Sequence, residues 1–187
     1  MSITSKISTN RLLLRPFQLS DANDVQRLAG DFAIADTTLD IPHPYEDGMA
    51  EEWIKSHEQN AASGREFVFA IIQVDTKKLI GAIGLKVNSA HQNAELGYWI
   101  GKPYWNKGFA TEAAQAILNF GFSDLGLERI HAHFLSRNPA SGRVMEKLGM
   151  QYEGKLRKHI KKWDKLEDIE MYGILRYDYQ SKYADII

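Results

Sequence analysis

The stretch PYWNKGFATEA, residues 103–113, places Asn106, Lys107 and Gly108 directly before a segment with the spacing of an apolar helix. A helix N-terminus favours an anion through its free N–H groups and its dipole, a glycine lets the backbone approach, and a lysine adds a cation. The stretch therefore suits phosphate binding, although an ordinary helix start explains it at least as well. It lacks the GK[ST] ending of a Walker loop and the GxGxxG pattern of a dinucleotide-binding loop, so the usual markers of ATP hydrolysis and nicotinamide chemistry are missing.

Other residue types argue against several kinds of site. The sequence has no cysteine, which excludes disulfides, thiolate zinc sites and a cysteine acyl-enzyme. His131 and His133 share one face of a predicted strand, yet no third ligand accompanies them, so packing or hydrogen bonding is favoured and no metal is expected. The basic run at 155–165 is more typical of a guarded strand edge than of an RNA surface. With a net charge of −1, we expect no nucleic-acid binding.

The bulk composition describes an ordinary globular protein. Its 187 residues fit one domain, residues 1–187, since domains usually have about 100–200 residues. With 44% hydrophobic and 25% charged residues, the chain can bury a core without disulfides. The N-terminal apolar run is too short for a signal peptide, and no window is long enough to cross a bilayer. We therefore expect a cytoplasmic enzyme or binding protein without membrane contacts.

Hydrophobic periodicity and turn residues predict a mixture of helices and strands. Helices are predicted at 20–30, 47–62, 109–122 and 139–148, the third of them buried nearly all round. Strands are predicted at 12–14, 67–74, 79–87, 94–100, 129–135, 151–159 and 168–176. Pro42 and Pro44 indicate a loop over 31–45. Short connections on both sides of the helix at 109–122 make its flanking strands parallel. The expected fold class is α+β, or mixed α/β, with helices packed on one sheet.

Several motifs in order resemble the GNAT superfamily of N-acetyltransferases, and more closely its RimJ/RimL-like group of ribosomal-protein N-terminal acetyltransferases. They are TNRLLLRPFQLSDANDV, IPHPY, AELGYWIGKPYWNKGFATEA, GLERIHAHFLSRNPASGRVMEKLGM, YEGKLRKHI and EDIEMYGIL, and the likeness covers nearly the whole chain. The resemblance implies a single GNAT-like domain whose mostly antiparallel, twisted sheet is flanked by helices. It also implies that the sheet is splayed at a central parallel strand pair, 94–100 and 129–135, and that acetyl-CoA lies in this V.

The resemblance further implies which residues hold acetyl-CoA. The pyrophosphate would lie on the loop at 106–111, and the pantetheine arm and the thioester carbonyl would contact backbone N–H groups near Tyr98–Ile100. In the family pattern of Arg or Gln, two residues, Gly, one residue, and Gly or Ala, Gly108 and Ala110 match, whereas Trp105 replaces the Arg or Gln. Asn138 would bind the pantetheine arm or cap the helix that Pro139 begins. The implied cofactor-binding residues are Tyr98, Trp99, Ile100, Asn106, Lys107, Gly108, Phe109, Ala110, Thr111 and Asn138.

Acetyl transfer from a thioester to an amine requires a neutral amine, a stabilised oxyanion and a thiolate that leaves, preferably protonated. Without a cysteine, direct attack in a ternary complex is favoured over an acyl-enzyme. Glu95 is the candidate base, although a lone strand carboxylate is often only solvated. The resemblance places the Ser141 hydroxyl near the CoA sulfur as proton donor. Many superfamily members use a tyrosine later in this helix, where this chain has Met145.

The acceptor is a primary amine, and the pKa of that amine bears on its class. An α-amine near pKa ~7.7–8.0 loses its proton more readily than a lysine near ~10.4, so one weak carboxylate base favours a protein N-terminus, for instance a ribosomal one. A polyamine, amino acid or antibiotic is the alternative acceptor, and a non-catalytic acyl-CoA-binding domain is the alternative function. By analogy, His43, Tyr45 and Trp53 wall the acceptor site. A homodimer is also implied.

Overall fold

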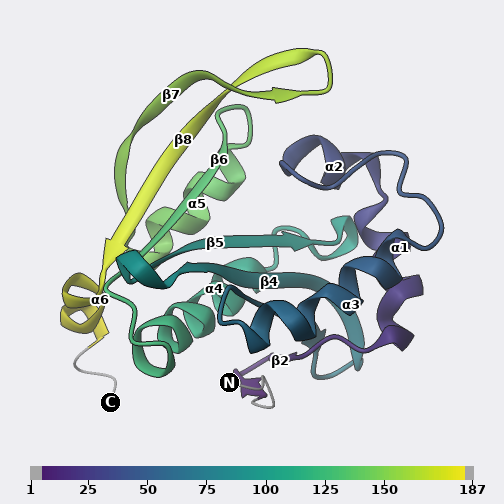
Figure 1. The fold of residues 1–187 in the computed structure, drawn as a ribbon, viewed down its shortest axis with the longest axis horizontal. Coiled ribbons are helices and arrows are strands. Elements are labelled where there is room, and N and C mark those ends of the chain that lie inside the picture. Colours follow the sequence, from purple (N-terminus) through teal and green to yellow (C-terminus); the bar gives the residue numbers. More distant parts are fainter. Residues whose placement is uncertain (1–5, 184–187) are drawn as a thin grey trace.

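Eight strands form one sheet in the computed structural model, which describes residues 6–183 (Figure 1). They are β1 (Ile7–Ser8), β2 (Leu12–Arg15), β3 (Glu66–Gln73), β4 (Lys78–Asn88), β5 (Asn93–Ile100), β6 (Arg129–Leu135), β7 (Gln151–Lys162) and β8 (Lys165–Leu175). Their order in the sheet is β1-β2-β3-β4-β5-β6-β8-β7. Neighbours run antiparallel except β5 and β6, which are parallel as the short connections predicted.

The sheet divides between its two parallel strands. β5 and β6 pair only over Asn93–Glu95 and Arg129–His131, although β5 continues to Ile100 and β6 to Leu135. Each strand keeps its other neighbour along its full length, β4 for β5 and β8 for β6. The two halves of the sheet therefore separate beyond Glu95, and Figure 1 shows β6 and β8 leaving the plane of β4 and β5. The predicted splayed sheet is confirmed.

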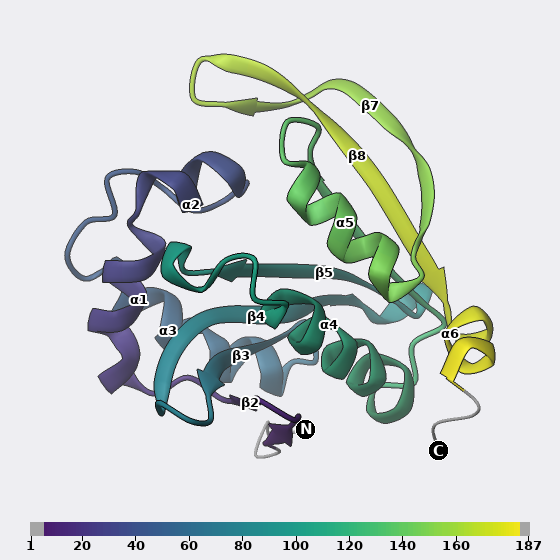
Figure 2. The ribbon, with the colours of Figure 1, turned by 180° about the vertical axis from the view of Figure 1, so that it is seen from behind.

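Helices cover both faces of the first half of the sheet. Helices α1 (Ala22–Ala29) and α3 (Met49–Ala62) lie on one face, and α4 (Phe109–Asn119) lies on the other (Figures 1 and 2). Leu28 and Ile54 share a buried cluster with Trp99, whereas Ile117 shares a second cluster with Leu85. Burial on both faces explains why β3 is apolar throughout its interior instead of alternating.

Three further helices complete the fold. Helix α5 (Pro139–Leu148) packs on α4 and β6, and α6 (Arg176–Tyr183) follows β8 (Figure 2). Helix α2 (Phe32–Thr37) follows α1 on the side where the sheet opens. Within residues 6–183, no helix combines the length and the apolar character needed to cross a membrane.

Two predictions about local structure were wrong. Residues 31–45 are not a loop throughout, because Asp31 caps α2 by accepting a hydrogen bond from the backbone N–H of Ala33, and the two prolines come only after this helix ends. Helix α4 is not buried nearly all round. One side contacts the sheet, but Asn119 is exposed, and the helix continues as a π-helical turn over Phe120–Asp124.

Candidate active site

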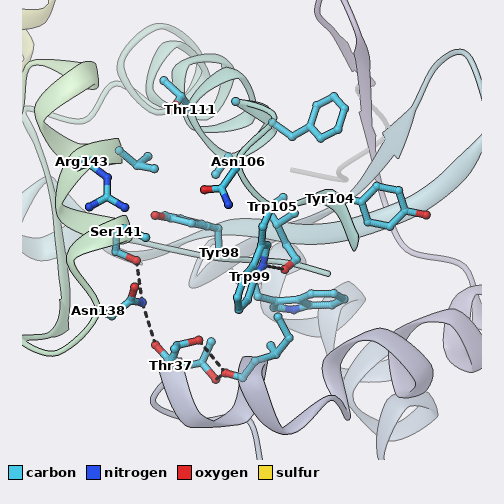
Figure 3. Close-up of a pocket in the computed structure, with 18 of the residues that line it drawn as sticks. Thr37, Tyr98, Trp99, Tyr104, Trp105, Asn106, Thr111, Asn138, Ser141 and Arg143 are labelled. Carbon is cyan, nitrogen blue, oxygen red and sulfur yellow. Dashed lines mark hydrogen bonds between the residues drawn. The ribbon is translucent and has the colours of Figure 1, made fainter. Parts of the chain in front are cut away.

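A cavity of about 350 Å³ lies where the two halves of the sheet separate (Figure 3). The end of β5, the N-terminus of α4 with the loop before it, one side of α5 from its N-cap to Lys147, and residues within 34–38 at α2 line it. Its lining includes nine of the ten residues predicted to bind acetyl-CoA, namely Tyr98, Trp99, Ile100, Asn106, Gly108, Phe109, Ala110, Thr111 and Asn138. Residues from three separate segments of the chain thus line one cavity, because β5 and β6 diverge beside the N-terminus of α4.

The loop before α4 has the conformation that an anion cradle requires. Gly108 is the N-cap of α4 with a φ of +80°, and Asn106 has a φ of +59°. No side chain caps the helix at Gly108, so N–H groups of the first turn are available to a bound group. Lys107, the tenth predicted residue, does not line the described cavity. Its Nζ atom donates to the carbonyl of Pro103 at 3.0 Å.

An arginine from the other end of the chain supports this loop. Nη1 of Arg11, from the turn between β1 and β2, donates to the carbonyl of Lys107 at 2.9 Å. The same guanidinium pairs with Glu112 in the first turn of α4 and lies over the ring of Phe109. Burial by itself raises the pKa of Glu112, but hydrogen bonds from the Thr9 hydroxyl and from the backbone and side chain of Arg11, together with the Arg11 charge, lower it overall. Arg11 therefore positions the loop, a role that its local sequence does not indicate.

Two cationic side chains and one indole in the cavity were not predicted. Arg143 and Lys147 lie four residues apart on α5 and both line the cavity, so they place positive charge opposite the start of α4. Their spacing on one helix face is a signal that the sequence did contain. Trp105 also lines the cavity, and its indole N–H donates to the carbonyl of Ile100 (Figure 3).

Asn138 occupies the N-cap position of α5, but its side chain does not cap the helix, contrary to one of its two expected roles. Its amide Nδ2 donates to the carbonyl of Thr37 at 3.3 Å and to Oγ of Ser141 at 3.1 Å (Figure 3). Pro139 has no N–H to be capped, and the N–H of Ser141 bonds to the backbone carbonyl of Asn138 instead. The amide thus joins α2 to α5 and orients the Ser141 hydroxyl.

A second cavity, of about 260 Å³, is lined by residues of β3, β4, β5 and β6 together with residues 37–41. It shares Thr37, Thr38, Tyr98, Trp99 and Ser141 with the first cavity, so the two meet at these residues. Apolar side chains such as Val68, Leu96 and Met145 form much of its wall, together with the carboxylates of Asp40, Glu66 and Glu95. A donor in the first cavity and an acceptor in the second would therefore come together at Tyr98 and Ser141.

Glu95 lies at the point where β5 and β6 separate, and it lines the second cavity. Its Oε1 atom is 3.5 Å from Nδ1 of His133, which lines the same cavity. The Glu95 side chain is 38% exposed and that of His133 is 16% exposed, so the carboxylate can be reached from the cavity. His133 was predicted only to pack or hydrogen-bond. Its position beside Glu95 depends on the parallel register, in which Glu95 is opposite His131.

The three residues predicted to wall the acceptor site have different positions. Trp53 lines the second cavity and packs edge-on against Phe17. Among the described residues, His43 and Tyr45 line neither cavity. His43 packs on Phe32 outside the site, and Tyr45 packs against the core formed by α1 and α3.

The tip of the β7–β8 hairpin holds one wall of the second cavity in place. Lys162 is buried, and its Nζ atom donates to the carbonyls of Leu39 at 3.1 Å and Ile41 at 3.2 Å. Burial lowers the pKa of Lys162, and the nearby carboxylates of Asp36 and Asp40 oppose this shift. These contacts hold residues 39–41, which form one wall, against a strand more than a hundred residues away in sequence.

Comparisons with known proteins agree with this arrangement. Residues 11–151 match the family model described as acetyltransferase (GNAT) domain. The uncharacterised N-acetyltransferase p20 of Bacillus licheniformis is 32% identical over 173 residues, 91% of this chain and 96% of that protein. The spermidine N(1)-acetyltransferase of Vibrio cholerae is 29% identical over 177 residues, 94% of this chain and 97% of that protein.

The fold is shared with solved structures of lower identity. The crystal structure of ribosomal-protein-S5-alanine acetyltransferase from Vibrio fischeri has a TM-score of 0.83 and 19% identity to this chain, covering 94% of this chain and 98% of that one. The family model spans well over half of the sequence. The chain belongs to the GNAT family and is an acetyl-CoA-dependent N-acetyltransferase.

Proposed function

We propose that this enzyme acetylates the α-amine of a protein N-terminus, with ribosomal proteins as one candidate class. The observation that carries the proposal is the Glu95–His133 pair, 3.5 Å apart, in the lining of the second cavity. It provides one carboxylate base supported by one imidazole. Such a base suits an amine that loses its proton near neutral pH.

The first cavity fits acetyl-CoA. The N–H groups that follow Gly108 and the cations of Arg143 and Lys147 would hold the phosphates, and Asn138 with the backbone at Tyr98–Ile100 would hold the pantetheine arm. The hydroxyl of Tyr98 is buried and has no hydrogen-bond partner of regular geometry within residues 6–183, as expected of a group that faces a ligand. When bound, acetyl-CoA supplies the acetyl group as a thioester with a thiol leaving group.

The acceptor amine must lose one proton before or during attack. Glu95 would take this proton, directly or through a water molecule, and Nδ1 of His133 would orient the carboxylate. An α-amine near pKa ~7.7–8.0 costs about 3–4 kcal/mol less to deprotonate at neutral pH than a lysine near ~10.4. One solvent-accessible carboxylate therefore supports α-amine chemistry better than lysine chemistry.

A small polyamine is the second candidate acceptor, and the charges of the second cavity favour it. The carboxylates of Asp40, Glu66 and Glu95 line the cavity, against one lysine, Lys86, among the described lining residues. The volume of about 260 Å³ lies just below the usual range of ~300–1,000 Å³ for small-molecule pockets. A polyamine acceptor is also what the name of the Vibrio cholerae relative states for that protein.

A panel of acceptors distinguishes these proposals. Purified protein with acetyl-CoA would be given peptides with a free N-terminal Ser, Ala or Met, the same peptides with a blocked N-terminus and an internal lysine, and spermidine. Release of CoA thiol and mass spectrometry would locate the acetyl group. The proposal expects acetylation of free N-termini only. Preference for spermidine would move the assignment to the second candidate, and acetylation of blocked peptides would overturn both.

A homodimer and a cytoplasmic location also belong to this proposal, and the resemblance to RimJ/RimL-like enzymes supports them. Light scattering coupled to size-exclusion chromatography would measure the mass of the particle in solution. Twice the mass of one 21.3 kDa chain would agree with the dimer, and a single chain mass would contradict it.

A further inference from the structure

The hydroxyl of Tyr98 is a buried polar group without a conventional protein partner. Its oxygen is inaccessible to solvent and makes no hydrogen bond of regular geometry to the described residues, although the Ser141 hydroxyl is close enough to influence it. A buried hydroxyl that is not hydrogen-bonded is costly, so it needs an explanation such as a bound water or ligand, or a role in chemistry. Tyr98 is also one of the residues that line both cavities.

The side chains of Asn138 and Ser141 determine the group to which the Tyr98 hydroxyl can donate its proton. Nδ2 of Asn138 donates to Oγ of Ser141, so the proton of the Ser141 hydroxyl is free to point elsewhere, and Oγ can accept a second hydrogen bond. Figure 3 shows the Tyr98 ring pointing from β5 towards Ser141 on α5. The side chains of Asn138, Ser141 and Tyr98 therefore follow one another in this order, and Ser141 and Tyr98 line both cavities.

We propose that Tyr98 supplies the proton that the departing thiolate takes up through the Ser141 hydroxyl. The inference rests on the proposed roles of Ser141 and of the two cavities. Tyr98 acts through Ser141 and is in this sense a positioning and relay residue.

The acidities of the Tyr98 and Ser141 hydroxyls support a proton transfer from Tyr98 through Ser141 to the thiolate. An alkyl hydroxyl such as that of serine is a far weaker acid than a phenol, which ordinarily titrates near ~10, and a thiol titrates near ~8.5. Serine alone would therefore protonate the thiolate against a much larger difference in pKa than a phenol would. Burial raises the pKa of Tyr98 and the Ser141 hydroxyl opposes the shift, which keeps the phenol protonated at neutral pH.

The step balances as follows. The amine nitrogen forms the amide bond and loses a proton to Glu95, and the carbon–sulfur bond breaks with its electron pair going to sulfur. Sulfur takes the proton of Ser141, which takes the proton of Tyr98. The tyrosinate regains a proton from solvent through the half-buried Ser141 hydroxyl, and Glu95 releases one proton to solvent. The sum is thioester plus amine giving amide plus thiol.

Other groups at the junction are poorer donors. Thr37 and Thr38 also line both cavities, but their hydroxyls donate to carbonyls within α2, each with a bond of 2.8 Å. Met145 on α5 is a thioether without a proton to give. Tyr98 and Ser141 are the two remaining hydroxyls among the described residues that line both cavities.

The first test needs no acceptor. Calorimetry would compare the binding of CoA and of desulfo-CoA, which lacks the sulfur, to wild type, Tyr98→Phe, Ser141→Ala and the exposed control Tyr177→Phe. The proposal expects wild type and the control to bind CoA several-fold more tightly than desulfo-CoA, and both site variants to lose this preference. An unchanged preference in Tyr98→Phe would overturn the inference. Thermal unfolding of each variant would show that it is folded.

The second test uses the pH dependence of turnover. With acetyl-CoA and the Ser-initiated peptide or spermidine, Tyr98→Phe should lower kcat about 10²-fold and leave the KM for acetyl-CoA within about twofold. Replacing Tyr98 with 3-fluorotyrosine, a more acidic phenol, should move the alkaline limb of kcat to lower pH. A limb that does not move would contradict the relay. Wild type that binds CoA but acetylates no free N-terminus would overturn the proposed acceptor, while the CoA comparison would still decide the role of Tyr98.

Discussion

Oε1 of Glu95 and Nδ1 of His133 lie 3.5 Å apart across the point where β5 and β6 separate. The two residues are 38 positions apart in the sequence, and the parallel pairing of β5 with β6 brings them together. Because the strands diverge immediately beyond Glu95, the pair lines the second cavity, the proposed acceptor site, instead of being covered by the sheet. The divergence of the sheet thus creates both the cavity and the access to its candidate base.

Glu95→Gln should lower kcat by about 10²–10⁴-fold, because the amide cannot accept the proton of the amine. The affinity for acetyl-CoA should not change, since Glu95 does not line the first cavity. Steady-state kinetics and calorimetry would measure the two effects. Glu58→Gln, an exposed change on α3, is the matched control. Unchanged turnover would mean that the Glu95 carboxylate is only solvated.

Gly108→Asp should weaken acetyl-CoA binding at least tenfold, about 1.4 kcal/mol, because it places a carboxylate at the N-terminus of α4 where the phosphates are expected. Calorimetric titration would measure the loss. Gly64→Asp controls for backbone strain. Gly64 has a φ of +69°, close to the +80° of Gly108, and an added side chain there meets no atom within 4 Å. If Gly64→Asp and Gly108→Asp lose the same affinity for acetyl-CoA, backbone strain and not the added charge is responsible.

Lys162→Met should raise the KM for the acceptor several-fold and leave acetyl-CoA binding unchanged. Methionine keeps much of the buried volume but cannot donate to the carbonyls of Leu39 and Ile41, so that wall of the acceptor cavity is released. Kinetics with the acceptor panel would measure the change. Lys161→Met, at the exposed neighbouring position, should have no such effect. An unchanged KM would show that the hairpin does not hold the cavity in shape.

The stability of the protein should fall as the pH decreases from about 6.5 to about 4, in part because of His57. This side chain is buried against Trp53 and Phe17, and burial lowers its pKa from 6.5 to about 4. The unfolded chain therefore binds a proton in this window that the folded protein does not, which favours unfolding at lower pH. Above pH 6.5 the imidazole is neutral in both states, and its contribution no longer changes.

His57→Phe should remove this part of the pH dependence. The shift from 6.5 to about 4 corresponds to about 3 kcal/mol of unfolding free energy between pH 7 and pH 4. Urea denaturation at several pH values would measure it, with the exposed His91→Gln as the control. If wild type and His57→Phe lose stability equally between pH 7 and pH 4, the histidine is not buried in its neutral form.

Much of the fold follows from signals that act between near neighbours in the chain. The strand–helix–strand spacing from 94 to 135 predicted the parallel pair, and the turn before 79 predicted the β3–β4 hairpin. Asn106 and Gly108 adopt left-handed conformations at the predicted helix start. The helix at 32–37 was missed because the prolines that follow outweighed the cap at Asp31.

By itself, the sequence determined the sheet, its parallel pair, the loop at 106–111 and the family, because each depends on residue order or on groups a few positions apart. The tertiary structure decided what the site contains. His133 beside Glu95, Arg11 beneath the loop, Lys162 on the acceptor wall and the buried hydroxyl of Tyr98 all depend on contacts between distant segments. Such contacts form only once the sheet divides and the helices pack, since packing and not local preference sets which distant side chains meet.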